Sequence, residues 1–244
     1  MRGRGEAAGR VLYPIPMEKQ STFDVLVVSG SPCGVSAGLL RDLAARSERV
    51  VAVDSGVRWV LDAGLVPDLL IGDMDSAPAD LLARCDGLGV PRVQVDPVEK
   101  DETDLELALA HVRGEGARRV AATNTLGGRI DHELAAMGAF ARCGLDVRCY
   151  EDSCTAGFLC DGPDAGAMPR ELRPAELGVA AGEEFSVVAL WGSARVTQSG
   201  VRYPQDGFEV GPLSGLGISN VLESEDALVS VADGRIAVIA PRRV

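Results

Sequence analysis

The chain has 244 residues, a hydrophobic fraction of 46% and a formal net charge of −12 at pH 7. That hydrophobic fraction is typical of a globular protein, and the length suits one large domain or two modest ones. The negative charge argues against a nucleic-acid partner, whose phosphates need a basic surface. No apolar stretch approaches the roughly 18 uninterrupted residues of a membrane span, so none is expected.

The start of the chain and the cysteines indicate in which cellular compartment the protein works. Residues 1–20 contain arginines but no apolar segment of the kind found in secretory signals, and we expect a flexible tail there. Six cysteines occur without a C-x-x-C pair, which together with the presence of only two histidines disfavours a zinc site. Scattered cysteines in a chain without a signal indicate reduced thiols and a cytoplasmic protein.

Strands and helices alternate over the first part of the chain. Short apolar, β-branched runs predict strands, and the segments between them have helical patterns. The predicted strands are 23–29, 49–54, 68–72, 92–95, 119–125 and 146–150, and the predicted helices are 35–46, 57–64, 79–85, 103–113 and 131–143. This alternation is typical of a parallel sheet covered on both faces, so we expect a Rossmann-like α/β domain at residues 21–152.

The composition changes after Glu151. Residues 153–178 contain Gly-Pro, Met-Pro and Arg-Pro steps, which are typical of a connection. In residues 179–244 the apolar runs are short and separated by turns, and Asp233-Gly234 between two alternating runs predicts a β-hairpin. We therefore expect a second, small all-β sandwich domain at residues 179–244.

Five aspartates lie just after a predicted strand or at the start of a predicted helix. They are Asp54, Asp73, Asp75, Asp104 and Asp131. Because the carboxyl ends of parallel strands share one edge of the sheet, these carboxylates should meet there. Two carboxylates about 4 Å apart repel by roughly 4 kcal/mol at an effective dielectric constant near 20. A divalent cation relieves that repulsion, and oxygen ligands favour Mg²⁺.

Simpler explanations exist for several of these residues. Asp73 and Asp75 are compatible with a turn, although their place at a strand end favours a function. Thr103 and Glu106 form a helix capping box, which accounts for them without any function. In that case Asp104 is a favourable charge in the first helical turn.

The glycines of residues 127–129 (Gly-Gly-Arg) lie between a predicted strand and a predicted helix. Glycine lets the backbone approach a phosphate, which the helix amides and the arginine can bind; a plain strand-to-helix connection is equally compatible. The sequence contains neither a P-loop motif nor a complete G-x-G-x-x-G motif, and it contains no serine nucleophile elbow. P-loop enzymes and standard dinucleotide oxidoreductases are therefore disfavoured.

Four short segments stand out when the chain is taken as a whole. Three lie in the α/β part: residues 73–76 (DMDS), 100–104 (KDETD) and 127–132 (GGRIDH). The fourth, residues 216–220 (LGISN), lies in the β-rich part. Together and in this order, they resemble the motifs of thiamine pyrophosphokinases. The resemblance implies an α/β catalytic domain followed by a β-sandwich domain, working as a homodimer. It also implies transfer of pyrophosphate from ATP to the hydroxyl of thiamine, giving thiamine diphosphate and AMP.

The resemblance further assigns roles to residues of the α/β part. By this likeness Asp73, Asp75 and Asp104 would hold Mg²⁺ and the ATP phosphates. Asp131 would line the same pocket as a further catalytic residue. The other nucleotide-binding residues would be Asp54, Lys100, Asp101, Thr103, Gly127, Gly128 and Arg129.

In the β-rich part, the resemblance implies that Tyr203, Ser219 and Asn220 hold thiamine. The chain departs from the family at two places. Tyr203 stands where some relatives have tryptophan, and Ser55 stands where glycine is usual.

Three other functions remain open. A related pyrophosphokinase could act on another alcohol, such as a hydroxymethylpterin, although the Ser219-Asn220 motif favours thiamine. A non-catalytic nucleotide or thiamine sensor on the same fold would not need all five aspartates. A generic acidic metal-binding protein would leave the order and spacing of the motifs unexplained.

Overall fold

The computed structural model describes residues 23–75, 77–94 and 101–242. Within these residues the parallel strands are β1 (Val25–Val28), β2 (Val50–Val53), β3 (Leu69–Gly72), β4 (Arg92–Gln94), β5 (Arg119–Thr123) and β6 (Asp146–Tyr150). They are hydrogen-bonded in the order β6-β5-β1-β2-β3-β4, and every neighbouring pair is parallel. The chain runs outward from β1 to β4 and then returns to the other side of β1. The order of the strands therefore reverses between β1 and β5.

Helices cover both faces of these strands. They are α1 (Ala37–Ala45), α2 (Val57–Asp62), α3 (Ala79–Gly87), α4 (Asp104–Gly114) and α5 (Ile130–Arg142). Successive side chains of a strand point to opposite faces. Accordingly, Val25 and Val27 belong to a buried cluster with residues of α4 and α5, whereas Leu26 and Val28 belong to a cluster with residues of α1, α2 and α3. No helix in the described part of the chain is long and apolar enough to cross a membrane.

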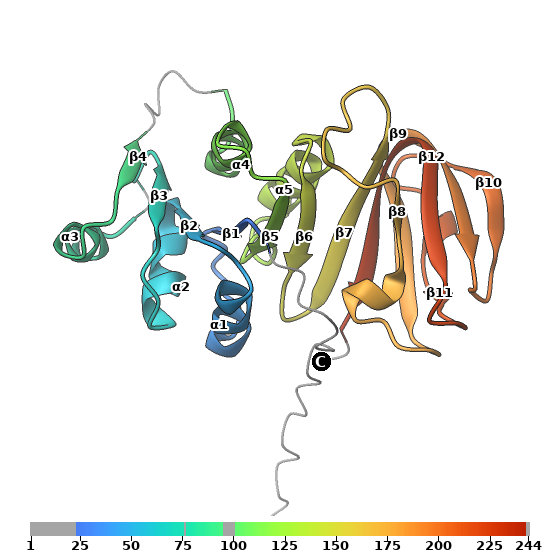
Figure 1. Ribbon diagram of the computed structural model, residues 1–244, viewed down its shortest axis with the longest axis horizontal. Coiled ribbons are helices and arrows are strands. Elements are labelled where there is room, and N and C mark those ends of the chain that lie inside the picture. Colours follow the sequence, from blue (N-terminus) through green and yellow to red (C-terminus); the bar gives the residue numbers. More distant parts are fainter. Residues whose placement is uncertain (1–22, 76, 95–100, 243–244) are drawn as a thin grey trace, which may run out of the picture.

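The antiparallel strands join the same sheet. They are β7 (Cys154–Asp161), β8 (Glu171–Leu172), β9 (Glu184–Ser199), β10 (Gln205–Val210), β11 (Asn220–Val221) and β12 (Leu228–Pro241). Because β7 pairs with both β6 and β12, the sheet continues from β4 at one end of the molecule to β10 at the other (Figure 1). The mixed α/β class is therefore confirmed. Residues 153–178, predicted as a connection, include a strand at the middle of this sheet, and the separate sandwich domain stays a prediction.

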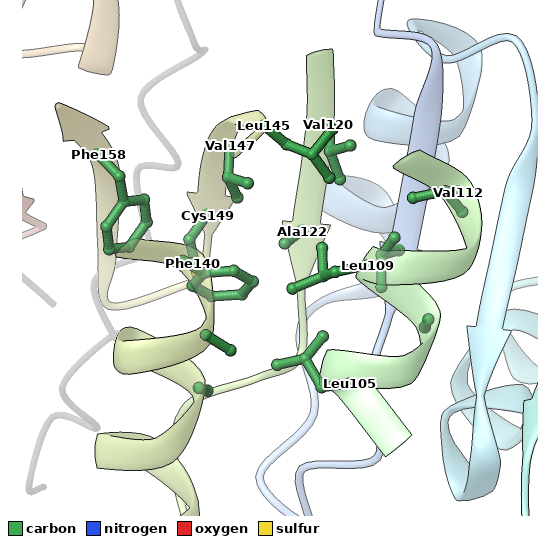
Figure 2. Close-up of a cluster of buried hydrophobic side chains, with 14 of the residues drawn as sticks. Leu105, Leu109, Val112, Val120, Ala122, Phe140, Leu145, Val147, Cys149 and Phe158 are labelled. Carbon is green, nitrogen blue, oxygen red and sulfur yellow. The ribbon is translucent and has the colours of Figure 1, made fainter. Parts of the chain in front are cut away.

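A buried apolar cluster links the two halves of the sheet. Figure 2 shows Leu105, Leu109 and Val112 of α4 on the side of the helix that faces β5, at the spacing of one helical face. In the same cluster, Phe140 of α5 packs against Phe158 of β7, with ring centroids 5.2 Å apart. The helix that covers the parallel strands thus also covers the first antiparallel strand.

The predicted hairpin at Asp233-Gly234 is wrong. These residues lie inside β12, where the pairing with β9 shifts register on both sides of Asp233. Gly234 has a φ of 88°, and a Cβ there would lie 2.6 Å from the carbonyl oxygen of Ser193. Asp-Gly suits a β-bulge as well as a tight turn, and here it bends a strand that continues.

Candidate active site

A cavity of about 600 Å³ lies where the strand order reverses, between β1 and β5. Its walls come from the segments after β1, β2 and β5 and from the first turns of α4 and α5. These segments meet because the carboxyl ends of parallel strands share one edge, where open α/β proteins form their ligand crevices. The volume suits a small organic ligand.

Three carboxylates gather beside this cavity. Asp54 follows β2, and Asp73 and Asp75 follow β3. One carboxylate oxygen of each lies within 4.8 Å of the others. The backbone is left-handed at Asp54 (φ 47°) and at Met74 (φ 65°), and the amide of Asp75 donates a 3.1 Å hydrogen bond to Oδ1 of Asp73. These tight conformations after adjacent strands bring the three side chains together.

The charges of this group act on one another. The hydrogen bond and negative charge of Asp73 raise the pKa of Asp75, and the charges of Asp54 and Asp104 raise this pKa further. A divalent cation would relieve the repulsion, and oxygen-only donors suit Mg²⁺. The residues present therefore fit a Mg²⁺ ion. The sequence predicted Asp104 as the third metal ligand, but Asp54 takes that place in the group. Asp104 lies in the first turn of α4, from which its charge acts on Asp75.

The glycines of the loop between β5 and α5 pack against the segment after β1. Gly127 has a φ of 87°, and a Cβ there would lie 2.8 Å from the Cβ of Cys33. Gly128 has a φ of 132°, and its Cβ would lie 2.7 Å from Cγ of Pro32. Both the conformation and the space therefore require glycine. Gly127 itself is part of the cavity wall.

Arg129 and Asp131 also line the cavity, and they form an ion pair with each other. Nε of Arg129 donates a 3.1 Å hydrogen bond to Oδ1 of Asp131. The hydrogen bonds and charge of Arg129 lower the pKa of Asp131 to about 2. Both side chains are well exposed, at 73% and 60%. Asp131 thus lies with Arg129 and outside the group of three carboxylates.

The start of α4 forms the expected capping box. Oγ1 of Thr103 accepts from the amide of Glu106 at 3.3 Å, and the carboxylate of Glu106 accepts from the amide of Thr103 at 3.0 Å. Thr103 and Asp104 line the cavity. Asp101 is exposed and, in the described chain, is absent from the cavity wall. Lys100 and Ser76 lie outside the described residues.

The residues expected to bind thiamine lie together in the antiparallel half, and the described wall of the cavity does not include them. Asn220 is 4% exposed. Its Oδ1 accepts from the amides of Tyr203 (3.1 Å) and Val221 (2.9 Å). Its Nδ2 donates to Oε1 of Gln198 (3.1 Å) and to the carbonyl of Tyr203 (3.0 Å). All four hydrogen-bonding positions of the amide are used, so none remains for a ligand.

The neighbours of Asn220 are accessible. Tyr203 is 62% exposed, so its ring is free to contact a ligand. Ser219 is also exposed and has a φ of 58°, and its amide donates to Oγ of Ser186 at 3.1 Å. The exposed ring of Tyr203 and the hydroxyl of Ser219 are therefore the groups here that can meet a substrate.

Two buried polar residues of the cavity wall were missed in the sequence. Ser29 follows β1 and Asn124 follows β5, and they are 9% and 1% exposed. Within the part of the chain that the structure describes, Oγ of Ser29 and Oδ1 of Asn124 have no hydrogen-bond partner. A buried unsatisfied polar atom is costly, so these atoms point to a ligand. Their position after buried strands, the same signal that identified the aspartates, could have revealed them.

Glu151 supports this wall from behind and was also missed. Its buried carboxylate accepts from the amides of Asn124 (3.2 Å), Thr125 (2.7 Å) and Leu126 (3.2 Å). Burial raises the pKa of Glu151, and the hydrogen bonds from this segment oppose the increase. The side chain thus fixes the segment that leads into the glycine loop.

Comparison with known proteins identifies the α/β part. Residues 40–149 match the family described as thiamin pyrophosphokinase, catalytic domain. A curated thiamine pyrophosphokinase from Bacillus subtilis (strain 168) is 32% identical over 111 residues, which are 44% of this chain and 50% of that protein. The matched region thus spans half the length of this relative.

Solved structures extend the likeness to nearly the whole fold. The crystal structure of thiamine pyrophosphokinase from Bacillus subtilis has a TM-score of 0.73 at 21% identity, covering 90% of this chain and 99% of that chain. Yeast thiamin pyrophosphokinase has a TM-score of 0.71 at 11% identity, covering 93% and 88%. At these identities the structures show a shared fold. Residues 40–149 are thus similar in sequence to the catalytic domain of thiamin pyrophosphokinases, and the likeness of the rest of the chain is one of fold.

Proposed function

We propose that this protein is a thiamine diphosphokinase, which transfers pyrophosphate from ATP to the hydroxyl of thiamine and releases AMP. The observation that carries the proposal is the group of Asp54, Asp73 and Asp75 at the crevice edge of the parallel sheet. A glycine loop and the start of α5 lie at the same cavity. The family match over residues 40–149 includes all of these residues.

The phosphate side of the reaction needs positive potential in an acidic site. Asp54, Asp73 and Asp75 would hold Mg²⁺, with Asp104 adding negative charge nearby. When bound, the ion would neutralise phosphate charge and orient the polyphosphate. Arg129 would add hydrogen bonds to phosphate oxygens, and the N-terminal end of α5 would add positive potential from its helix dipole.

The residues around the cavity would position the substrates for direct transfer. Attack on the β-phosphorus requires the thiamine oxygen in line with the departing AMP, so positioning accounts for much of the rate. Ser29 and Asn124 are placed to hydrogen-bond ATP with their unused oxygens. Asp131, with a pKa of about 2, is a weak base, and we assign it to holding Arg129.

Thiamine would be bound by the exposed ring of Tyr203, which offers a stacking face for a flat cationic ring, and by Ser219. Asn220 would position the backbone of Tyr203 without contacting the substrate. Because these residues are outside the described cavity wall, we further propose a homodimer whose sites are shared between two chains.

Mixing two inactive variants tests the shared site. Asp73→Ala damages the phosphate side, and Tyr203→Ala damages the thiamine side. A heterodimer of the two would contain one site with both lesions and one with neither, so activity should reappear after subunit exchange. If exchange is demonstrated and the mixture stays inactive, each site is built within one chain.

Product analysis tests the activity itself. The protein is incubated with Mg²⁺, ATP and thiamine, and in parallel with hydroxymethylpterin in place of thiamine. We expect thiamine diphosphate and AMP in equal amounts, and no turnover of the pterin. Release of ADP, or preference for the pterin, would overturn the proposed reaction. A cytoplasmic location is part of the proposal, in keeping with six free cysteines.

A further inference from the structure

A second cavity, of about 790 Å³, lies at the opposite edge of the parallel strands. It is lined by the residues before β5 and β6, by the loop after β7 and by the bulge of β9 and β12. The last turns of α4 and α5 also contribute to its wall. In the described residues it shares no wall residue with the candidate active site. We call it the arginine cleft.

The arginine cleft is basic, although the chain carries a net charge of −12. Its wall contains Arg113, Arg118, Arg142 and Arg235. The acidic side chain in the described wall is Asp164, which is 82% exposed and lies 3.9 Å from Arg235. A cleft lined by one sign of charge concentrates ions of the opposite sign. The cleft therefore favours an anion.

The arginines are not all engaged by the protein. Arg142 pairs with Glu106 at 3.1 Å, and Arg113 donates to the carbonyl of Cys143 at 2.9 Å. By contrast, the guanidinium of Arg118 acts on Asp24 through its charge but forms no hydrogen bond or ion pair with any described residue. Nε of Arg235 is buried and has no hydrogen-bond partner among the described residues. Guanidinium groups bind phosphate with paired hydrogen bonds. Arg118 and Arg235 thus have capacity for such a ligand.

An aromatic ring completes the wall. Trp191 is 57% exposed, and the guanidinium of Arg142 lies 5.0 Å from the centre of its ring. Trp191 pairs with Arg235 between two register shifts of the bulge. Bulges redirect side chains, and this one, with Gly192 at φ 69° and Gly234 at φ 88°, places a tryptophan and an arginine at the same cavity.

We propose that the arginine cleft binds a nucleotide, with phosphates at Arg118 and Arg235 and the base stacked on Trp191. The volume suits such a ligand, and a flat base gains from an exposed aromatic face. The inference rests on the cleft alone and does not depend on the proposed pyrophosphate transfer.

Calorimetric titration of the full chain with ADP in the presence of a chelator tests the proposal, since the acidic site then lacks its cation. Arg118→Gln should weaken ADP binding about tenfold or more, because a charged hydrogen-bond donor is lost. Arg84→Gln is the matched control. Arg84 is exposed on α3, at the far end of the sheet from the arginine cleft, and its substitution removes the same charge. It should bind ADP as the parent chain does.

The ring is tested with inorganic diphosphate, which lacks a base. ADP should bind at least about fivefold more tightly than diphosphate, and Trp191→Leu should remove that preference. Absence of ADP binding at millimolar concentration would overturn the proposal, as would equal affinities of the Arg118→Gln and Arg84→Gln variants. An ADP preference that survives Trp191→Leu would overturn the placement of the base.

Discussion

Two buried asparagines show how the two halves of the sheet differ. Asn220, in the antiparallel half, uses all four positions of its amide within the protein. Asn124, at the edge of the parallel half, donates to the carbonyls of Ser29 (2.6 Å) and Ser31 (3.3 Å), and its Oδ1 has no partner among the described residues. Both side chains are buried. What distinguishes a residue poised for a ligand is the hydrogen-bonding capacity that the fold leaves unused.

The largest effect is expected at the carboxylates of the parallel edge. Asp75→Asn should lower turnover about 100-fold or more, because a group that orients phosphate is lost. The raised pKa of Asp75 means that its charge destabilises the fold, so without metal the parent chain loses stability as pH rises through that pKa. The variant should escape this loss and melt at an equal or higher temperature at neutral pH. Substantial turnover by the variant would remove Asp75 from the site.

The contrast between the two asparagines predicts different effects of their substitution on stability and on ATP binding. Asn220→Ala should lower the free energy of unfolding by about 2–4 kcal/mol, because it leaves the buried amide of Val221 and the buried Oε1 of Gln198 unpaired. Asn124→Ala should cost less stability, about 1–2 kcal/mol, and should raise the KM for ATP. Denaturant unfolding and steady-state kinetics measure both quantities. If Asn124→Ala leaves ATP binding intact, its free oxygen does not serve the nucleotide.

The glycine loop allows the cost of a left-handed backbone conformation to be separated from the cost of a steric clash. Gly127→Ala should cost about 2–4 kcal/mol, the sum of a positive φ and a clash with Cys33. Gly116 has a similar φ of 96°, but the space around a Cβ there is open. Gly116→Ala should therefore lower the free energy of unfolding by about 1 kcal/mol. Thermal unfolding of the two variants gives the difference. Equal losses would show that the loop moves away from Cys33 without cost.

The smallest effect concerns Glu151. Burial raises its pKa above the usual value, so the parent chain gains stability at low pH and loses it as pH rises through the raised pKa. Glu151→Gln has no group that titrates. Its NH₂ is a hydrogen-bond donor, however, and would face backbone N–H donors that now bind the carboxylate. The variant should therefore be less stable than the parent chain at acidic pH, and the difference in their free energies of unfolding should narrow toward neutral pH. A gap that is constant over this range would contradict a raised pKa.

The sequence predicted the parts of the fold that depend on local patterns. The strands before Asp54 and Asp73 are apolar runs that end abruptly, and their parallel pairing brings these residues to one edge. Which carboxylates come closest depends on the neighbours in the sheet: β2 and β3 are adjacent, so Asp54 lies in the group, whereas Asp104 is fixed by the cap of α4. No local sequence pattern shows whether Asp54 or Asp104 lies next to Asp73 and Asp75.

Other features depend on partners far along the chain. Asp233-Gly234 looks like a turn, and only the pairing of β12 with β9 shows that the strand continues. Asn220 looks like a binding residue until Gln198 and Tyr203 are seen to use its amide. These partners are 22 and 17 residues away, beyond the reach of a motif.

The position of β12 has a consequence for synthesis of the protein. β12 lies between β7 and β9, both of which precede it in the chain. As the nascent chain leaves the ribosome, β7 and β9 therefore each present an unpaired edge until residues 228–241 have emerged. Unpaired edges can add strands from other chains. In the interval between translation of β9 and of β12, a newly made chain thus has two open strand edges at which it can aggregate.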